Sequence, residues 1–290
     1  MHRRRPFVLP ALLGLLLSVL APAAASADPS ERAQQRATGY YLALGDSLAA
    51  GYQPTTGDDK DGGYVGGVAA AVRLSSPKTR LVNLACSGET VVTMVDGGGC
   101  DYAKGSQLAA AQQFLHAHGR FTRVITLDIG ANDVQRCVRS GGIDLVCVQG
   151  GLRDVATTLP GVVAALRAGA PNARIVVLNY FNPFLAAYLT GPAGQALAAQ
   201  STELQRQLNS IIAGAAAGNA RVADVAGAFR STDTTPVTDP VIGTVPTNVA
   251  TICALTWMCV RQDIHANDAG YAVMASTVVG VLVRERATAA

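Results

Sequence analysis

The sequence predicts an α/β fold, a three-layer doubly wound sandwich around a central, mostly parallel five-stranded sheet. Two observations favour this fold class. Short apolar runs of four or five residues show no alternation with polar side chains, which is typical of parallel strands buried on both faces. Longer segments with helical spacing alternate with these runs, and such alternation places helices on both faces of a parallel sheet.

The predicted strands are the near-continuous apolar runs, each of which is followed by a turn or a helix candidate. They are residues 40–44, 81–85, 124–127, 175–178 and 222–225. The predicted helices carry apolar residues at helical spacing and are rich in Ala, Leu and Gln, which favour helices. They are residues 64–74, 107–118, 152–168, 194–217 and 269–286.

Three stretches interrupt this alternation. Residues 53–63 and 95–100 are rich in Gly and Asp and are predicted surface loops. Residues 230–261 have four Pro or Gly breakers and no clear period, and so long a loop is usually functional or disordered. Two cysteines and the only tryptophan indicate that its second half is ordered. The length would also allow two smaller domains. Because the α/β alternation continues across these stretches, we expect one domain over residues 40–290, after a polar leader at residues 28–39.

The first 27 residues have the three parts of a secretion signal. A basic start precedes an apolar run at residues 7–20, and Ala25-Ser26-Ala27 fits the small-residue cleavage rule. The alternative is an uncleaved membrane anchor, but the run is shorter than the ~20 apolar residues that a spanning helix needs. We therefore expect cleavage of residues 1–27, a secreted, extracellular protein, and no stable membrane span after signal removal.

Net charge argues against a nucleic-acid partner. The chain has 23 Lys and Arg against 20 Asp and Glu, and three of the arginines lie in the predicted signal. The mature chain is then neutral, without the basic surface that a phosphate backbone requires, and 5% aromatic residues leave little for base stacking. G-x-G-x-x-G and P-loop patterns are absent, so we expect no cofactor. We expect a monomer.

The six cysteines are an even set, which an exported protein can oxidise to three disulfides. Six cysteines allow 15 connectivities, and the sequence alone does not choose among them. Sequential pairing closes the shortest loops at the least cost in chain entropy, so it is the pairing we expect. The pairs are Cys86 with Cys100, Cys137 with Cys147, and Cys253 with Cys259. The alternative, a zinc site, lacks a C-x-x-C pair and histidines at ligand spacing, so we expect no metal.

The strongest local motif is Gly45-Asp46-Ser47, directly after the first predicted strand. Sites in α/β sheets gather beyond the carboxyl ends of the strands, so this turn would bring the Ser47 hydroxyl into the crevice. A serine nucleophile needs a base. Of the four histidines, one lies in the signal and two on a polar helix, which leaves His265. The alternative for Ser47 alone is an ordinary helix N-cap.

Three further blocks follow in chain order. They are Cys86-Ser87-Gly88-Glu89, Gly130-Ala131-Asn132-Asp133 and Asp263-Ile264-His265, all at predicted strand ends or loops on one side of the sheet. Together with the first motif they resemble the SGNH branch of the GDSL family of secreted bacterial serine esterases and lipases. The resemblance spans residues 40–275 and implies an SGNH-hydrolase-like, flavodoxin-like sheet.

The resemblance implies a role for each residue. Ser47 would be the nucleophile and His265 the general base and acid. The backbone N–H groups of Ser47 and Gly88 and the side-chain amide of Asn132 would form the oxyanion hole, for which fixed neutral donors are suited. Taken singly, Gly88 could be a plain turn glycine and Asn132 an Asx-turn residue.

One position departs from the family pattern. The family commonly has an aspartate three residues before the histidine, where this chain has Gln262; Asp263 lies two residues before it. Three alternatives follow. Asp263 orients the imidazole, a main-chain carbonyl near Gln262 does so in a Ser-His dyad, or a remote acid substitutes. Asp46 and Asp133 are interpreted as loop-fixing acceptors.

The resemblance implies hydrolysis of a carboxylic ester through an acyl-enzyme, with a lipid or a short- or medium-chain acyl ester as the small-molecule substrate. The alternatives are a carbohydrate or cell-envelope O-acetyl esterase and a catalytically silent cell-surface interaction protein of the same fold. Residues 180–184 and the Leu255, Trp257 and Met258 segment are candidates for the acyl pocket, or simply pack on the core.

Overall fold

The computed structural model describes residues 39–139 and 142–288. The predicted secretion signal, and the predicted leader up to residue 38, lie outside the described residues, so both stay predictions. Within the described part of the chain, no helix is both long and apolar enough to cross a membrane.

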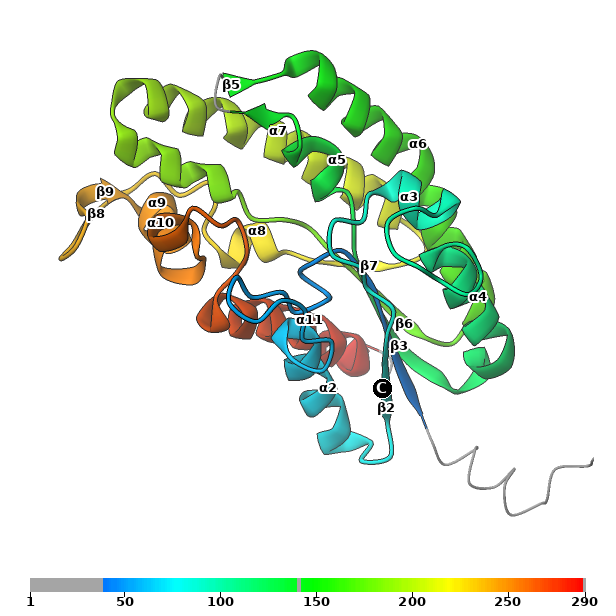
Figure 1. Cartoon of the computed structure of the whole chain (residues 1–290). Helices are drawn as coiled ribbons and strands as arrows, with labels where there is room; N and C mark the ends of the chain where they lie inside the picture. Colours follow the sequence, from blue (N-terminus) through cyan, green and yellow to red (C-terminus); the bar gives the residue numbers. More distant parts are fainter. Residues whose placement is uncertain (1–38, 140–141, 289–290) are drawn as a thin grey trace, which may run out of the picture.

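A five-stranded, all-parallel sheet forms the centre of the molecule and confirms the predicted fold class (Figure 1). Its strands stand in the order β2-β1-β3-β6-β7, the doubly wound flavodoxin-like order. All five lie within two residues of the predicted ranges, because each contains an apolar run with no competing period, although the edge strands β2 and β7 are only partly buried. They are β1 (Tyr40–Gly45), β2 (Arg80–Asn83), β3 (Thr122–Asp128), β6 (Arg174–Leu178) and β7 (Arg221–Ala223).

Helices cover both faces of this sheet (Figure 1). On one face α2 (Gly63–Ser75) packs against α11 (Asp268–Thr288), which also contacts β6, β7 and the short α8 (Val225–Ala228). On the other face α6 (Leu145–Gly169) packs between α4 (Gln107–His118) and α7 (Pro192–Ala216). The core is continuous across the sheet and is built from the strand side chains and the inner stripe of each helix.

One predicted helix start and two predicted loops differ from the structure. Helix α6 begins seven residues earlier than predicted, because the Asp144 carboxylate accepts the Cys147 N–H at 3.0 Å and caps the helix there. The predicted loop at residues 95–100 overlaps the end of a short helix, α3 (Val91–Asp96), which a Thr90–Thr93 capping box begins.

The predicted irregular segment at residues 230–261 is largely regular. It contains the hairpin β8 (Pro236–Asp239) and β9 (Gly243–Pro246), followed by α9 (Thr247–Leu255) and α10 (Met258–Arg261). The remaining short elements connect the layers. They are η1 (Gly119–Phe121), α5 (Ala131–Gln135), β4 (Val138–Arg139), β5 (Gly142–Ile143) and η2 (Pro183–Thr190).

Disulfides close three short loops. The bonded pairs are Cys86–Cys100, Cys137–Cys147 and Cys253–Cys259, at sequence separations of 14, 10 and 6 residues, and they are the sequential pairs. The first holds the segment between β2 and α4, and the third joins α9 to α10.

Candidate active site

The turn after β1 carries Ser47. Gly45 ends the strand with φ of 141°, and a Cβ there would stand 2.2 Å from the Asp128 carbonyl oxygen. The close approach of β1 to β3 at this point therefore requires glycine. The Asp46 N–H donates to that same carbonyl at 3.1 Å. The chain then turns sharply, and Ser47 lies at the carboxyl edge of the sheet with 8% of its surface exposed.

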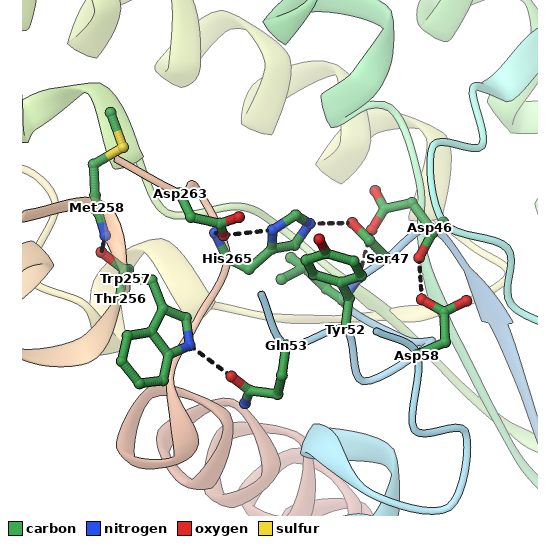
Figure 2. A network of polar contacts seen from close by, with 12 residues as sticks. Asp46, Ser47, Tyr52, Gln53, Asp58, Thr256, Trp257, Met258, Asp263 and His265 are labelled. Carbon is green, nitrogen blue, oxygen red and sulfur yellow. Dashed lines mark hydrogen bonds and ion pairs between the residues drawn. The ribbon is translucent and has the colours of Figure 1, made fainter. Parts of the chain in front are cut away.

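His265 reaches Ser47 from the loop between α10 and α11. Its Nε2 lies 2.8 Å from the Ser47 Oγ, although 218 residues separate the two (Figure 2). The loop is held in place because the Trp257 N–H donates to the His265 carbonyl at 3.0 Å. The Tyr52 ring packs against the imidazole, with 4.3 Å between ring centroids. The two predicted residues are therefore brought together in a geometry suited to proton transfer.

Asp263 accepts from the other side of the imidazole. Its Oδ1 lies 2.7 Å from His265 Nδ1 and also accepts the His265 backbone N–H at 2.9 Å (Figure 2). This is an Asx turn, in which a carboxylate bonds the backbone two residues on. Gln262, with φ of 53°, ends α10 in the left-handed region and turns the chain into this conformation. The turn lets a carboxylate at the second position before the histidine reach the ring.

The three predicted oxyanion-hole residues follow β1, β2 and β3, at the same edge of the sheet. In the part of the chain that the structure describes, neither the Ser47 nor the Gly88 backbone N–H donates to another protein group. One N–H of the Asn132 side chain donates to the Glu89 carbonyl at 2.9 Å, which leaves its second N–H available. Ser47, Asn132 and His265 line one small cavity of about 20 Å³; Gly88 is not among its lining residues.

Gly88 occupies a turn that requires its conformation. The Glu89 N–H donates to the Cys86 carbonyl at 3.1 Å, and Gly88 has φ of 82°, as the third residue of a type II turn must. The Asp133 carboxylate accepts the Val91 N–H at 3.0 Å and anchors the chain just beyond the turn.

Gln107 joins this turn to the end of β1, a role that was not predicted from the sequence. Its side-chain oxygen accepts the Gly45 N–H at 2.7 Å, and its amide nitrogen donates to the Gly45 carbonyl and to the Glu89 carboxylate, both at 3.0 Å. Gln107 and Glu89 are fully buried. A glutamine at the start of a predicted helix carries no signal of this role, because its partners lie 18 and 62 residues away in sequence.

The apolar residues that were candidates for the acyl pocket separate into two groups. Tyr180 and Phe181 line the cavity beside Ser47, and Phe184 lines an adjoining cavity of about 30 Å³. Gln135 borders both cavities, and the second is walled mainly by aliphatic side chains from α5, β4, β5 and α7. Trp257 instead turns toward Gln53, to which its indole N–H donates at 2.6 Å (Figure 2), and it does not line either cavity.

Burial raises the pKa of three carboxyl groups around the site. The Asp46 carboxylate accepts from the Leu48 N–H at 3.0 Å and from the Tyr180 hydroxyl at 2.7 Å, yet its desolvation raises its pKa. Burial likewise raises the pKa of Asp133 to about 6 and the pKa of Asp128 well above its usual range. Asp46 and Asp133 fix loops, as the sequence analysis interprets them. Among the described residues, no three His, Cys, Asp or Glu side chains are grouped to hold a metal ion.

Comparisons with known proteins bear on the family and the fold. The model of the GDSL-like Lipase/Acylhydrolase family matches residues 43–273. A lipase from a goat rumen metagenome has a similar structure, with 16% identity and a TM-score of 0.54 over 83% of this chain and 96% of that one. An extracellular lipase from Streptomyces rimosus, 22% identical, gives a TM-score of 0.47 over 75% of this chain and 100% of its own. No curated protein matches the chain.

Proposed function

The chain belongs to the GDSL-like lipase/acylhydrolase family and is a hydrolase of ester bonds, and we propose that it is a secreted serine esterase that cleaves carboxylic esters through an acyl-enzyme on Ser47. One observation carries this proposal: Ser47, His265 and Asp263 are hydrogen-bonded in series, at 2.8 Å and 2.7 Å. Nucleophile, base and orienting group in this order form the arrangement that activates a serine hydroxyl.

In the proposed first half-reaction, the Ser47 Oγ attacks the ester carbonyl carbon while its proton passes to His265 Nε2. The tetrahedral oxyanion is stabilised by the Ser47 and Gly88 N–H groups and the free N–H of Asn132. When the C–O bond to the alcohol breaks, the imidazolium returns its proton to the departing oxygen. In the second half, water attacks the acyl-enzyme with the same base, and the carboxylic acid leaves.

Of the three alternatives for the third group, the geometry favours Asp263. Its carboxylate would keep the Nδ1–H tautomer of His265, so that Nε2 is free to accept the serine proton, and would stabilise the imidazolium.

The acyl group would lie in the cavity beside Ser47, and a longer chain would continue past Gln135 into the adjoining apolar cavity. The first cavity, of about 20 Å³, has room for about one water-sized group, such as the methyl of an acetyl ester. A medium acyl chain would also need the adjoining cavity, of about 30 Å³. The same small volume favours the second candidate, an O-acetyl esterase for carbohydrate or cell-envelope esters.

Covalent labelling tests the nucleophile. A fluorophosphonate should modify the native protein on Ser47 and should not modify Ser47→Ala. Ser87→Ala is the matched control, because Ser87 lies on the Gly88 turn and donates to the Asp58 carboxylate rather than to a histidine. Absence of labelling in folded wild-type protein would contradict the enzymatic proposal and favour the silent interaction protein.

Chain length separates the two substrate classes. Turnover of acetyl, octanoyl and palmitoyl esters is compared at matched concentration. Val138→Trp should fill the adjoining cavity and lower octanoyl turnover about tenfold relative to acetyl turnover. Val146→Trp, at an exposed position nearby, should leave the ratio unchanged. An acetyl-only profile that neither variant alters would identify the O-acetyl esterase.

Secretion and a single-domain organisation also belong to the proposed function. Three disulfides suit a secreted protein, since they persist in oxidising surroundings. We propose that residues 40–290 act as a single, monomeric domain once the signal is removed.

A further inference from the structure

The helical turn that carries Ser47 ends in a Schellman motif. The Tyr52 N–H donates to the Ser47 carbonyl at 3.0 Å, and the Gly51 N–H donates to the Leu48 carbonyl at 3.2 Å. This pair of hydrogen bonds closes a turn whose last residue is in the left-handed region, and Gly51 has φ of 67°. The motif brings the chain back over the start of the turn, so the Tyr52 backbone lies against that of Ser47.

The Tyr52 backbone is also held from a second side. The Tyr271 hydroxyl, on α11, donates to the Tyr52 carbonyl at 2.8 Å. The next residue is tied to the segment that carries the histidine. The Gln53 side-chain oxygen accepts the Trp257 indole N–H at 2.6 Å, and the Trp257 backbone N–H donates to the His265 carbonyl (Figure 2). Tyr52 is therefore fixed between the nucleophile turn, α11 and the loop that carries His265.

This placement sets the Tyr52 ring against the imidazole of His265. The ring centroids are 4.3 Å apart and the ring planes are inclined by 42° (Figure 2). The imidazole is hydrogen-bonded through Nε2 to Ser47 and through Nδ1 to Asp263. These two bonds leave the ring free to tilt about the line that joins its nitrogens, and a side chain packed against the ring restricts that tilt. An aromatic ring also attracts a cation, which the imidazole becomes when it takes a proton.

The ring of Tyr52, rather than its hydroxyl, is the part of the side chain in contact with the site. Among the described residues, the Tyr52 hydroxyl has no hydrogen-bond partner. Tyr52 is also not one of the residues that line the cavity beside Ser47. The side chain is thus placed to act through the imidazole and not through the acyl group.

We propose that Tyr52 is a positioning residue whose ring keeps the imidazole of His265 aligned with the Ser47 hydroxyl and attracts the imidazolium that forms during proton transfer. This inference rests on the proposed roles of Ser47 and His265. It gives the Schellman motif a second purpose, because one short stretch of chain then sets both the nucleophile and the packing of its base.

A second contact between a tyrosine and a histidine provides the matched control. Tyr40, at the start of β1, packs against His118 with ring centroids 4.8 Å apart and ring planes inclined by 41°. The two contacts have nearly the same geometry, but this one lies at the opposite end of β1 from Ser47. Tyr40→Leu therefore removes the same kind of ring from the same kind of partner without touching the base.

Kinetics of Tyr52→Leu and Tyr52→Phe test the proposal with a short acyl ester. Tyr52→Leu should lower kcat at least about tenfold and leave KM within about twofold of wild type, because the imidazole loses its packing while the substrate cavity is unchanged. Tyr52→Phe keeps the ring and should retain kcat within about threefold of wild type. Tyr40→Leu should also stay within about threefold.

Nuclear magnetic resonance observes the contact without turnover. The ring current of Tyr52 shifts the imidazole proton resonances of His265, which are assigned with His265→Gln. These resonances should move in Tyr52→Leu and change little in Tyr52→Phe. In Tyr40→Leu the resonances of His118 should move instead.

Four results would overturn the inference. They are a folded Tyr52→Leu variant with wild-type kcat, a Tyr52→Phe variant as slow as Tyr52→Leu, a raised KM at unchanged kcat, and His265 resonances that do not respond to Tyr52→Leu. If wild-type protein is labelled by a fluorophosphonate on Ser47, any of these results counts against the role of Tyr52 alone. If wild-type protein is not labelled while the His265 resonances respond as expected, the proposed function fails and the ring contact stands.

Discussion

Asp263 lies two residues before His265, where its Asx turn brings one carboxylate oxygen to both the His265 backbone N–H and the imidazole. Asp263→Asn should lower kcat by roughly 10³- to 10⁴-fold, because the amide no longer fixes the tautomer or stabilises the imidazolium. Steady-state turnover of a short acyl ester measures this.

The matched control is Asp268→Asn, a nearby carboxylate that accepts from Gln53 and not from the imidazole. It should retain wild-type turnover. A loss below tenfold in Asp263→Asn would exclude the triad and leave the Ser-His dyad or a remote acid.

Asp133 gives a pH dependence with a definite sign. Burial raises its pKa to about 6 from 3.8, so the folded state holds the proton more tightly, and stability falls as pH rises through this interval. The group should lower the unfolding free energy by about 3 kcal/mol between pH 4 and pH 7. Denaturant unfolding at several pH values should show a shallower fall for Asp133→Asn. An equal fall in both proteins would mean that Asp133 titrates normally.

At this scale the sequence predicted some site residues better than others. Ser47 and His265 could be selected because a nucleophile needs a base and only one histidine remained. The structure brings both into contact and, of the three alternatives for the third group, places Asp263 against the imidazole. Gln107 could not be predicted, because its importance comes from long-range contacts and burial rather than from a motif.

Helix α4 supports the site through its first residue. Gln107→Leu removes the partners of the Gly45 N–H and the Glu89 carboxylate, both in the interior, while the Gly45 carbonyl keeps the Cys86 N–H. Each unsatisfied buried group costs about 1–3 kcal/mol, so the variant should lose at least about 2 kcal/mol of stability and most of its turnover. Urea unfolding and kinetics check this.

Gln113→Leu, at an exposed position of the same helix, should leave both quantities unchanged. Wild-type kcat in a folded Gln107→Leu protein would show that the turn after β1 and the Gly88 turn do not depend on their link through α4.

The elements missed by sequence analysis share a physical cause. The strands were predicted because their short runs are almost continuously apolar and have no competing helical period. Helix α9 was missed because four of its nine residues are Thr, Val or Ile, which favour strands, and no side chain caps its start. Helix α3 has only six residues, too few for a period to be recognised, although its capping box was readable.

The disulfides act on the whole molecule through the unfolded chain. Replacing Cys86 and Cys100 by alanine should cost about 3 kcal/mol of stability, and replacing Cys253 and Cys259 should cost about 2 kcal/mol, because the shorter loop restricts the unfolded chain less. Denaturant unfolding of the two double variants ranks them. The opposite ranking would show that native contacts, not chain entropy, set the effect.

The sheet order explains how distant residues meet over the whole molecule. All five strands run parallel, so the turns that follow them open on one edge, where Ser47, Gly88 and Asn132 come from three adjacent strands. This convergence could be predicted from alternation alone. The strand order itself is consistent with the resemblance to the family.

The separation of 218 residues between Ser47 and His265 has a consequence for biosynthesis. A ribosome delivers the chain from its N-terminus, so the serine emerges long before its base exists. With the proposed roles of these two residues, every shorter nascent chain would carry an unactivated hydroxyl and would not hydrolyse an ester. Activity would then begin only after the last part of the chain has been made.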